Sequence, residues 1–66
     1  MAVAKVTEIT AESNKSFEDA IEQGIQRATK SLHGIKGAWV KEQKVTVADG
    51  KIVGYRVDLK VTFILD

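Results

Sequence analysis

The clearest pattern in the chain is an alternation of apolar and polar residues near its C-terminal end. From residue 53 to residue 65, an apolar side chain stands at every second position, and Ile64 is the one large apolar residue between them. The alternating residues are Val53, Tyr55, Val57, Leu59, Val61, Phe63 and Leu65. A period of two places them on one face of a β-strand. The pattern predicts a strand over residues 51–65 with one face turned toward the protein core.

A different spacing governs residues 17–32, where apolar residues recur at intervals of three and four. The stripe consists of Phe17, Ala20, Ile21, Gly24, Ile25, Ala28 and Leu32. This spacing predicts an amphipathic helix whose stripe packs on the sheet. Ser16 and Asp19 have the spacing of a capping box at the start of this helix. Gly34 is placed to end the helix in a left-handed conformation.

Two further strands are expected around these elements. Residues 3–10 are rich in β-branched side chains and predict a first strand, followed by a polar loop over residues 11–16. Residues 37–47 predict another strand, which the Asp49-Gly50 pair joins to the last one through a tight turn. We therefore expect an α+β fold of order β-α-β-β, a three-stranded antiparallel sheet packed on one helix, in one domain over residues 1–66.

The strand over residues 37–47 changes its parity along its length. Ala38 and Val40 occupy even positions, whereas Val45 and Val47 occupy odd ones, so a β-bulge is expected within residues 41–44. If Val40 faces the helix, then Trp39, the only tryptophan of the chain, faces away from it. A large aromatic side chain beside charges on an open sheet face indicates a subunit contact or a ligand site. The pattern does not separate these two interpretations.

The short chain makes oligomerisation the expected source of stability. A domain of 66 residues buries only about 60% of the surface of its unfolded chain. Domains of this size commonly depend on disulfides, a structural metal or oligomerisation. The sequence has no cysteine and a single histidine, His33, which excludes disulfides and a zinc site built by one chain. Assembly with further copies is the route that remains.

The charge balance excludes two large classes of partner. The formal net charge is +1, and charged residues of both signs make up 29% of the chain. A basic stripe for nucleic acid and a polybasic membrane anchor are both missing. The sequence has neither a signal-peptide pattern nor an apolar run of about 20 residues that could span a membrane. We expect a cytoplasmic protein that binds no nucleic acid and no membrane.

The polar residues offer candidate binding groups and no catalytic set. Arg56 and Asp58 point the same way from the last strand, and Arg56 can donate to a carboxylate, a phosphate or a ring edge. The alternative is an ion pair between Arg56 and Glu42 or Asp58 of the partner subunit. His33 is interpreted as a basic residue near the C-terminal end of the helix. Because no acid, base and nucleophile share a usable spacing, we expect that the protein is not an enzyme.

Carboxylates are scattered along the chain, without the spacing of a calcium-binding loop. They include Glu8, Glu42, Asp49, Asp58 and Asp66. Since hard cations need oxygen ligands and not a contiguous motif, a cation site assembled across subunits stays open.

Over essentially its whole length the chain resembles the dodecins, which are small β-α-β-β proteins. The resemblance is carried by KVTEI in the first strand, SFEDAIEQGIQRA in the helix, WVKEQ in the second strand and YRVDLKVTFILD at the end. It implies a hollow homododecamer without catalysis of its own. It also implies a storage or sequestration role, in which flavins such as riboflavin, FMN or lumichrome bind at subunit interfaces.

The chain departs from the family pattern at both flavin contacts. Where dodecins carry a stacking tryptophan this sequence has Gly37, and where they carry a glutamine it has Arg56. In one interpretation Trp39 stacks on the ligand, Arg56 and Glu42 act as polar clamps, and Gly37 leaves space. In the other, this is a non-flavin dodecin, a calcium- or magnesium-binding or purely structural shell. The predicted ligand-binding residues are Gly37, Trp39, Glu42, Arg56 and Asp58.

Overall fold

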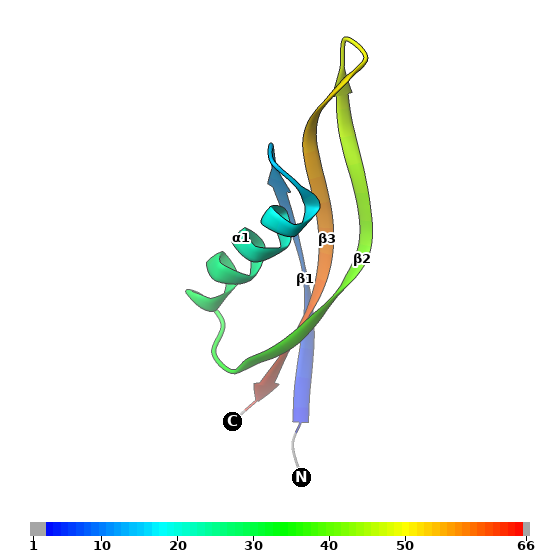
Figure 1. Ribbon diagram of the computed structural model, residues 1–66. Helices are drawn as coiled ribbons and strands as arrows, with labels where there is room; N and C mark the ends of the chain where they lie inside the picture. Colours follow the sequence, from blue (N-terminus) through cyan, green and yellow to red (C-terminus); the bar gives the residue numbers. More distant parts are fainter. Residues whose placement is uncertain (1–2, 66) are drawn as a thin grey trace.

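The computed structural model describes residues 3–65 and contains one helix and three strands (Figure 1). In chain order they are β1 (Val3–Ser13), α1 (Phe17–Thr29), β2 (Ile35–Ala48) and β3 (Lys51–Leu65). The strand order in the sheet is β1-β3-β2, and both pairings are antiparallel. The predicted β-α-β-β fold is therefore confirmed. The predicted domain also includes residues 1, 2 and 66, which lie outside the described range. The candidate carboxylate of Asp66 is therefore outside it as well.

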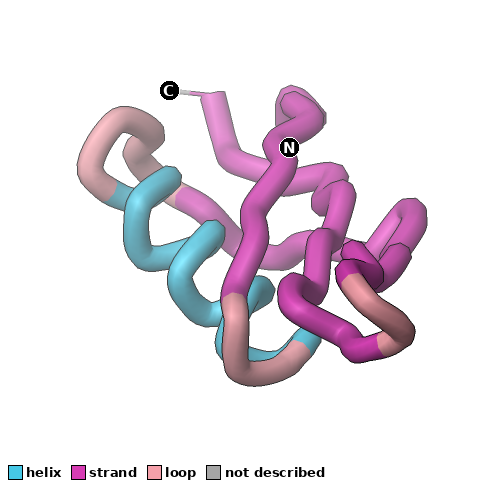
Figure 2. The backbone as a smooth tube through the Cα atoms, turned by 90° about the horizontal axis from the view of Figure 1, so that it is seen from above, coloured by secondary structure: helices cyan, strands magenta, loops and turns pink. Residues whose placement is uncertain are grey.

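The core lies between α1 and the strands β1 and β3. Val57, Leu59 and Val61 of β3 are fully buried, and Ala20 of the helix packs against them. Figure 2, seen from above, shows α1 along one side of the curved sheet. The two-residue period of β3 thus predicted the buried face correctly. The same face is exposed toward the ends of β3, at Val53 and Leu65.

The first strand is longer than its composition suggested. Residues 11–13, predicted as part of a loop, continue β1, because Ala11, Glu12 and Ser13 pair with residues of β3. Ser13 is buried, and its hydroxyl donates to a carboxylate oxygen of Asp19 at 2.5 Å. The polar composition of this segment does not indicate a strand. It is a strand because its backbone pairs with β3.

The helix begins as predicted and ends earlier. Ser16 is the N-cap, and its hydroxyl accepts from the backbone N–H of Asp19 at 3.0 Å. The helix stops at Thr29, not at residue 32, with Lys30 as a right-handed C-cap. Gly34 does adopt a positive φ of 72°, but it lies in the connection to β2, where its carbonyl accepts from Ile64 N–H. The predicted role of Gly34 as the helix cap is wrong.

The expected bulge and turn are both present in the β2–β3 hairpin. The register shifts between Val40 and Glu42, which leaves Lys41 as the extra residue. Asp49 and Gly50 have positive φ angles of 52° and 74°, as a tight hairpin turn requires. Two further shifts, between residues 35 and 37 and between 46 and 47, had no signal in the sequence.

The hairpin extends well beyond the helix and β1. Pairing between β1 and β3 stops at Tyr55, whose partner on β2 is Val45, so the hairpin arm begins at this pair and is two-stranded over residues 46–54, seen at the top of Figure 1. Its apolar side chains are exposed, namely Val45, Val47, Ile52 and Val53. The Cα radius of gyration is 13.5 Å, against about 11 Å for a compact chain of this length. No helix within the described residues is long and apolar enough to cross a membrane.

Candidate ligand site on the open sheet face

The open face is the side of the sheet that α1 does not cover. Register pairs on β2 and β3 put Gly37 opposite Thr62, Trp39 opposite Lys60, and Glu42 opposite Asp58. Trp39 faces away from the helix as predicted, because its neighbours Ala38 and Val40 pair with the buried Val61 and Leu59. Arg56 lies two residues before Asp58, on the same side of β3. All five predicted site residues therefore share the open face, spread along its length.

Trp39 is the most prominent side chain of this face. It is 52% exposed, and the Lys60 ammonium lies 5.9 Å from its ring centroid. This distance is within the range of a cation–π interaction. Lys60 was not among the predicted site residues. Its place opposite Trp39 depends on the register of β2 on β3, which is set by the hairpin turn, the register shift between residues 46 and 47 and the bulge at Lys41.

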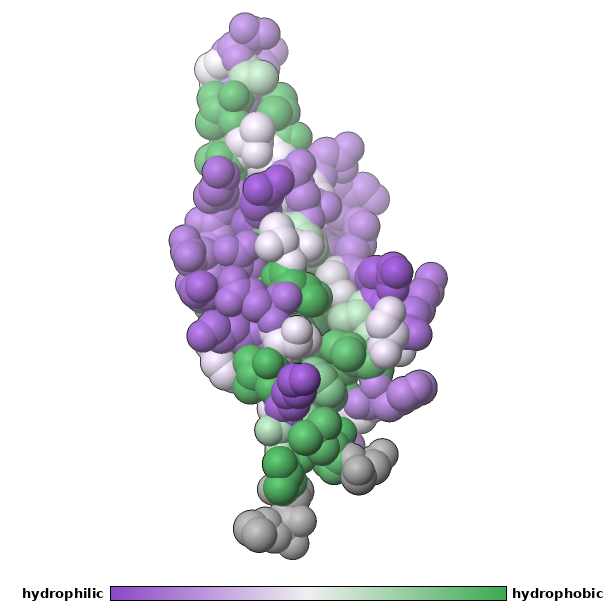
Figure 3. Space-filling view, turned by 180° about the vertical axis from the view of Figure 1, so that it is seen from behind, coloured by the Kyte–Doolittle hydropathy of each residue, from purple (hydrophilic) through white to green (hydrophobic). Residues whose placement is uncertain are grey.

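Next to the indole, the open face carries uncharged residues with small side chains or none. Gly37 lies one row further along β2, and a Cβ built there would meet nothing within 4 Å. In the same row Thr62 pairs with Gly37 on one side and with Val6 of β1 on the other. Val6 is exposed, and Figure 3 shows apolar surface at this end of the open face, separated from the apolar arm by a polar band. A flat molecule on Trp39 would find space over Gly37.

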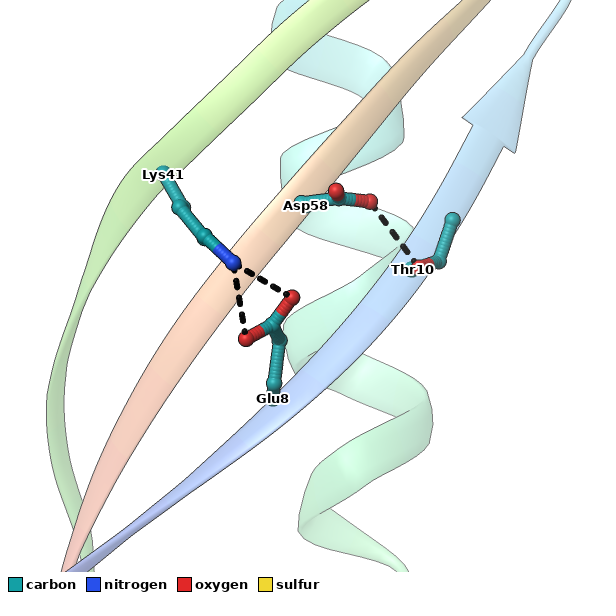
Figure 4. A network of polar contacts seen from close by, with 4 residues as sticks. All are labelled: Glu8, Thr10, Lys41 and Asp58. Carbon is teal, nitrogen blue, oxygen red and sulfur yellow. Dashed lines mark hydrogen bonds and ion pairs between the residues drawn. The ribbon is translucent and has the colours of Figure 1, made fainter.

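Charged side chains cross the middle of the open face, and three of them have polar partners within the chain. Lys41 Nζ lies 3.4 Å from Glu8 Oε2, and Thr10 Oγ1 donates to Asp58 Oδ1 at 3.0 Å (Figure 4). The bulge carries Lys41 onto this face. Such an exposed ion pair contributes about 1 kcal/mol or less to stability. The hydrogen bond from Thr10 orients the Asp58 carboxylate on the open face.

Arg56 is not a neighbour of Trp39. It lies four residues from Lys60 along β3, which corresponds to about 13 Å. Its Nε is 3.3 Å from Glu12 Oε1 of β1, and its register partner on β2 is Lys44. Glu12 was not predicted as a partner, because the polar composition of residues 11–13 is typical of a loop. A longer first strand in register with β3 would have placed Glu12 beside Arg56.

Two acidic residues lie opposite each other on the two strands of the hairpin. Glu42 and Asp58 are direct cross-strand partners and line a shallow hollow of about 40 Å³ together with Gln43, Lys44 and Arg56. Within residues 3–65, however, no group of three histidine or acidic side chains gathers as cation ligands. One chain therefore brings a carboxylate pair to this point, and further oxygen ligands would have to come from elsewhere.

Comparison with known proteins places this arrangement in a family. The dodecin family model matches residues 3–66. A calcium dodecin from Mycobacterium tuberculosis is 38% identical over 63 residues, which cover 96% of this chain and 89% of that protein. Its crystal structure, described as a calcium-chelating antigen with a novel calcium-binding site, matches with a TM-score of 0.83 at 40% identity, over 97% of this chain and 91% of that one.

A dodecin from Streptomyces davaonensis is similar over the whole fold. Its structure matches with a TM-score of 0.94 at 35% identity, covering 98% of this chain and 96% of that chain. The predicted resemblance to dodecins is thus confirmed by the family model, by a related sequence and by solved structures. This chain, a helix packed on one face of a three-stranded sheet with an exposed tryptophan on the other, belongs to the dodecin family.

Proposed function

We propose that this chain is a non-enzymatic dodecin that assembles into a homododecamer and stores a flat small ligand, of the flavin type, at contacts between copies. Trp39 is the stacking platform of the proposed site. The observation that carries the proposal is the half-exposed indole on a sheet face, with open space over Gly37 beside it. A single chain leaves this aromatic surface in water, where large aromatic side chains usually mark a binding surface.

The exposed surface of the single chain supports assembly. Its accessible area is 4862 Å², whereas size scaling gives about 4,100 Å² for a compact protein of this mass. The excess, roughly 750 Å², is close to the area that one partner contributes to a standard protein interface. The family to which the chain belongs supports the same conclusion.

Stacking on Trp39 is proposed to displace the Lys60 side chain. The ammonium now lies over the indole ring, where a planar ligand would lie, and a lysine side chain is flexible enough to swing aside. Of the polar groups in the predicted set, Glu42 and Asp58 lie one row from Trp39, and Arg56 lies two rows away. A three-ring ligand with a side chain would have to run along β3 to reach Arg56.

Fluorescence titration with riboflavin tests the proposed platform. We expect quenching of flavin emission by the native protein, at least tenfold weaker binding by Trp39→Ala, and an intermediate effect for Trp39→Phe, which keeps a smaller aromatic face. The oligomer mass is measured for each variant, so that loss of stacking is separated from loss of assembly. Equal riboflavin affinity in the native protein and in an assembled Trp39→Ala variant would remove Trp39 from the site.

A second candidate function is a cation-stabilised shell. The observation that favours it is the direct apposition of Glu42 and Asp58, together with 38% identity to a calcium dodecin. In this proposal the carboxylate pair and oxygen ligands of another copy together hold calcium or magnesium. Calcium takes about six to eight ligands and magnesium about six, so one carboxylate pair is not enough.

Removal of the cation distinguishes this second candidate. We expect a chelator to lower the thermal midpoint of the native assembly, added calcium to restore it, and Glu42→Gln to abolish both responses. Glu18→Gln, an exposed carboxylate on α1, is the matched control and should respond like the native protein. A midpoint that ignores both chelator and calcium would rule out a structural cation at this pair.

A further inference from the structure

A groove runs along the outer edge of β1, beside the helix, and belongs to neither proposed site. Its volume is about 500 Å³. Its apolar floor is formed by Ile9, Ala11, Gly24, Ala28 and Leu32, and its polar rim includes Glu12, Gln23, Arg27 and Ser31. Consecutive residues of β1 line it, so the groove extends over the edge of the strand onto both of its faces. Within residues 3–65 no strand pairs with this edge.

The hairpin arm presents apolar side chains that nothing in the described part of the chain covers. Val47 is 58% exposed, and Val45, Ile52 and Val53 are exposed on the same arm. The outer edge of β2 is also the end of the sheet in the strand order. Native proteins pair, cover or charge long free edges of this kind, since open backbone groups otherwise recruit other chains. A partner that covers this arm would be apolar and would present a strand edge.

We propose that the hairpin arm of one copy docks into the β1–α1 groove of the next copy. This inference rests on the proposed assembly and specifies which surfaces form one of its contacts. The apolar arm covers the apolar floor, and the free edges of β2 and β1 pair as strands of neighbouring copies. The rim of the groove carries Arg27, a cation that can pair with Asp49 at the tip of the arm, whereas Glu12 on the same rim is already paired with Arg56.

A second copy of the chain is the occupant that the exposed surface area favours. Each copy has both an arm and a groove, so one type of contact covers two surfaces of every subunit. The arm and the groove of one copy together share the surplus accessible surface of roughly 750 Å² relative to size scaling, which is about one partner's side of a standard interface. Because the two surfaces differ, the contact is heterologous, and repeating it closes a ring or continues a chain of subunits.

Two pairs of substitutions test the contact, each with a matched control. Val45→Lys with Val47→Lys charges the arm, and Val45→Ile with Val47→Ile keeps it apolar. Gln23→Trp with Ser31→Trp fills the groove, and Glu22→Trp with Gln26→Trp adds the same rings at exposed helix positions that do not line the groove. Circular dichroism confirms folding, and native mass spectrometry gives the particle mass. We expect smaller particles from both test variants and the native mass from both controls.

Mixing the two test variants gives the decisive result. The charged-arm variant retains an intact groove and the filled-groove variant retains an intact arm, so an equimolar mixture should regain mass through contacts between unlike copies, up to twofold. An unchanged mass on mixing would overturn the proposal. The proposal would also be overturned if the filled-groove variant had the native mass and the charged-arm variant did not. In that case the proposed assembly would remain, but the arm would dock elsewhere. A native protein that stays monomeric would overturn the proposed assembly as well.

Discussion

At the scale of single residues, the open face is defined by the cross-strand neighbours of each side chain. The sequence alone predicted that Trp39 faces away from the helix, because alternation decides the face of a strand residue. It did not predict Lys60 over the indole or Glu12 beside Arg56, because lateral neighbours depend on register. Register in turn depends on the Lys41 bulge and on the true length of β1. Site residues were thus predictable as a face and not as a set of contacts.

Lys60→Met is expected to strengthen binding of a neutral flavin. The Lys60 ammonium occupies the indole surface at 5.9 Å from the centroid, and an exposed cation–π contact is worth about 0.5–1 kcal/mol. A ligand that stacks there loses this contact, so its removal should tighten riboflavin binding about twofold to fivefold. Fluorescence titration measures the change. Lys30→Met, on an exposed helix position, is the control and should leave affinity unchanged; weaker binding by Lys60→Met would mean that the ammonium contacts the ligand.

At the scale of elements, the positions of the helix and strands follow from periodicity, and their ends do not. The stripe of α1 and the alternation of β3 gave the two buried faces correctly. The ends differed because they are set by tertiary pairing: residues 11–13 join β1 through β3, and the chain leaves the helix after Thr29. Gly34, read as a helix cap, instead takes its positive φ where its backbone meets Ile64.

Gly24→Ala is expected to destabilise the fold, although alanine is the better helix former. The added Cβ would lie 3.1 Å from Ala11 Cβ and 3.3 Å from Leu59 Cδ1, and this is where α1 approaches the sheet. We expect a net loss of about 1 kcal/mol, since overpacking costs about 1–3 kcal/mol against about 1 kcal/mol of helix propensity. Urea unfolding measures it. Gly37→Ala, with open space at its Cβ, should be neutral or slightly stabilising without ligand; equal effects at both positions would contradict the packing argument.

At the scale of the whole molecule, the single chain leaves much of its apolar surface uncovered. It buries a core of Ala20, Val57, Leu59 and Val61 and leaves exposed a 14-residue edge strand, an apolar arm and a tryptophan. The small size and the absence of cysteine led to the prediction of assembly with further copies, which the single chain does not test. The sequence did not predict the elongated shape, with a long axis of 51 Å produced by a hairpin that projects beyond the helix.

The most direct test of this account is the mass of the native protein in solution, measured by multi-angle light scattering at micromolar concentration. The account predicts a homododecamer, whose mass is twelve times the 7.2 kDa of the subunit, and no folded monomer in equilibrium with it. A folded particle of 7.2 kDa with native circular dichroism would contradict the account, because neither a ligand site between copies nor an arm docked in a neighbour's groove can exist on a lone chain.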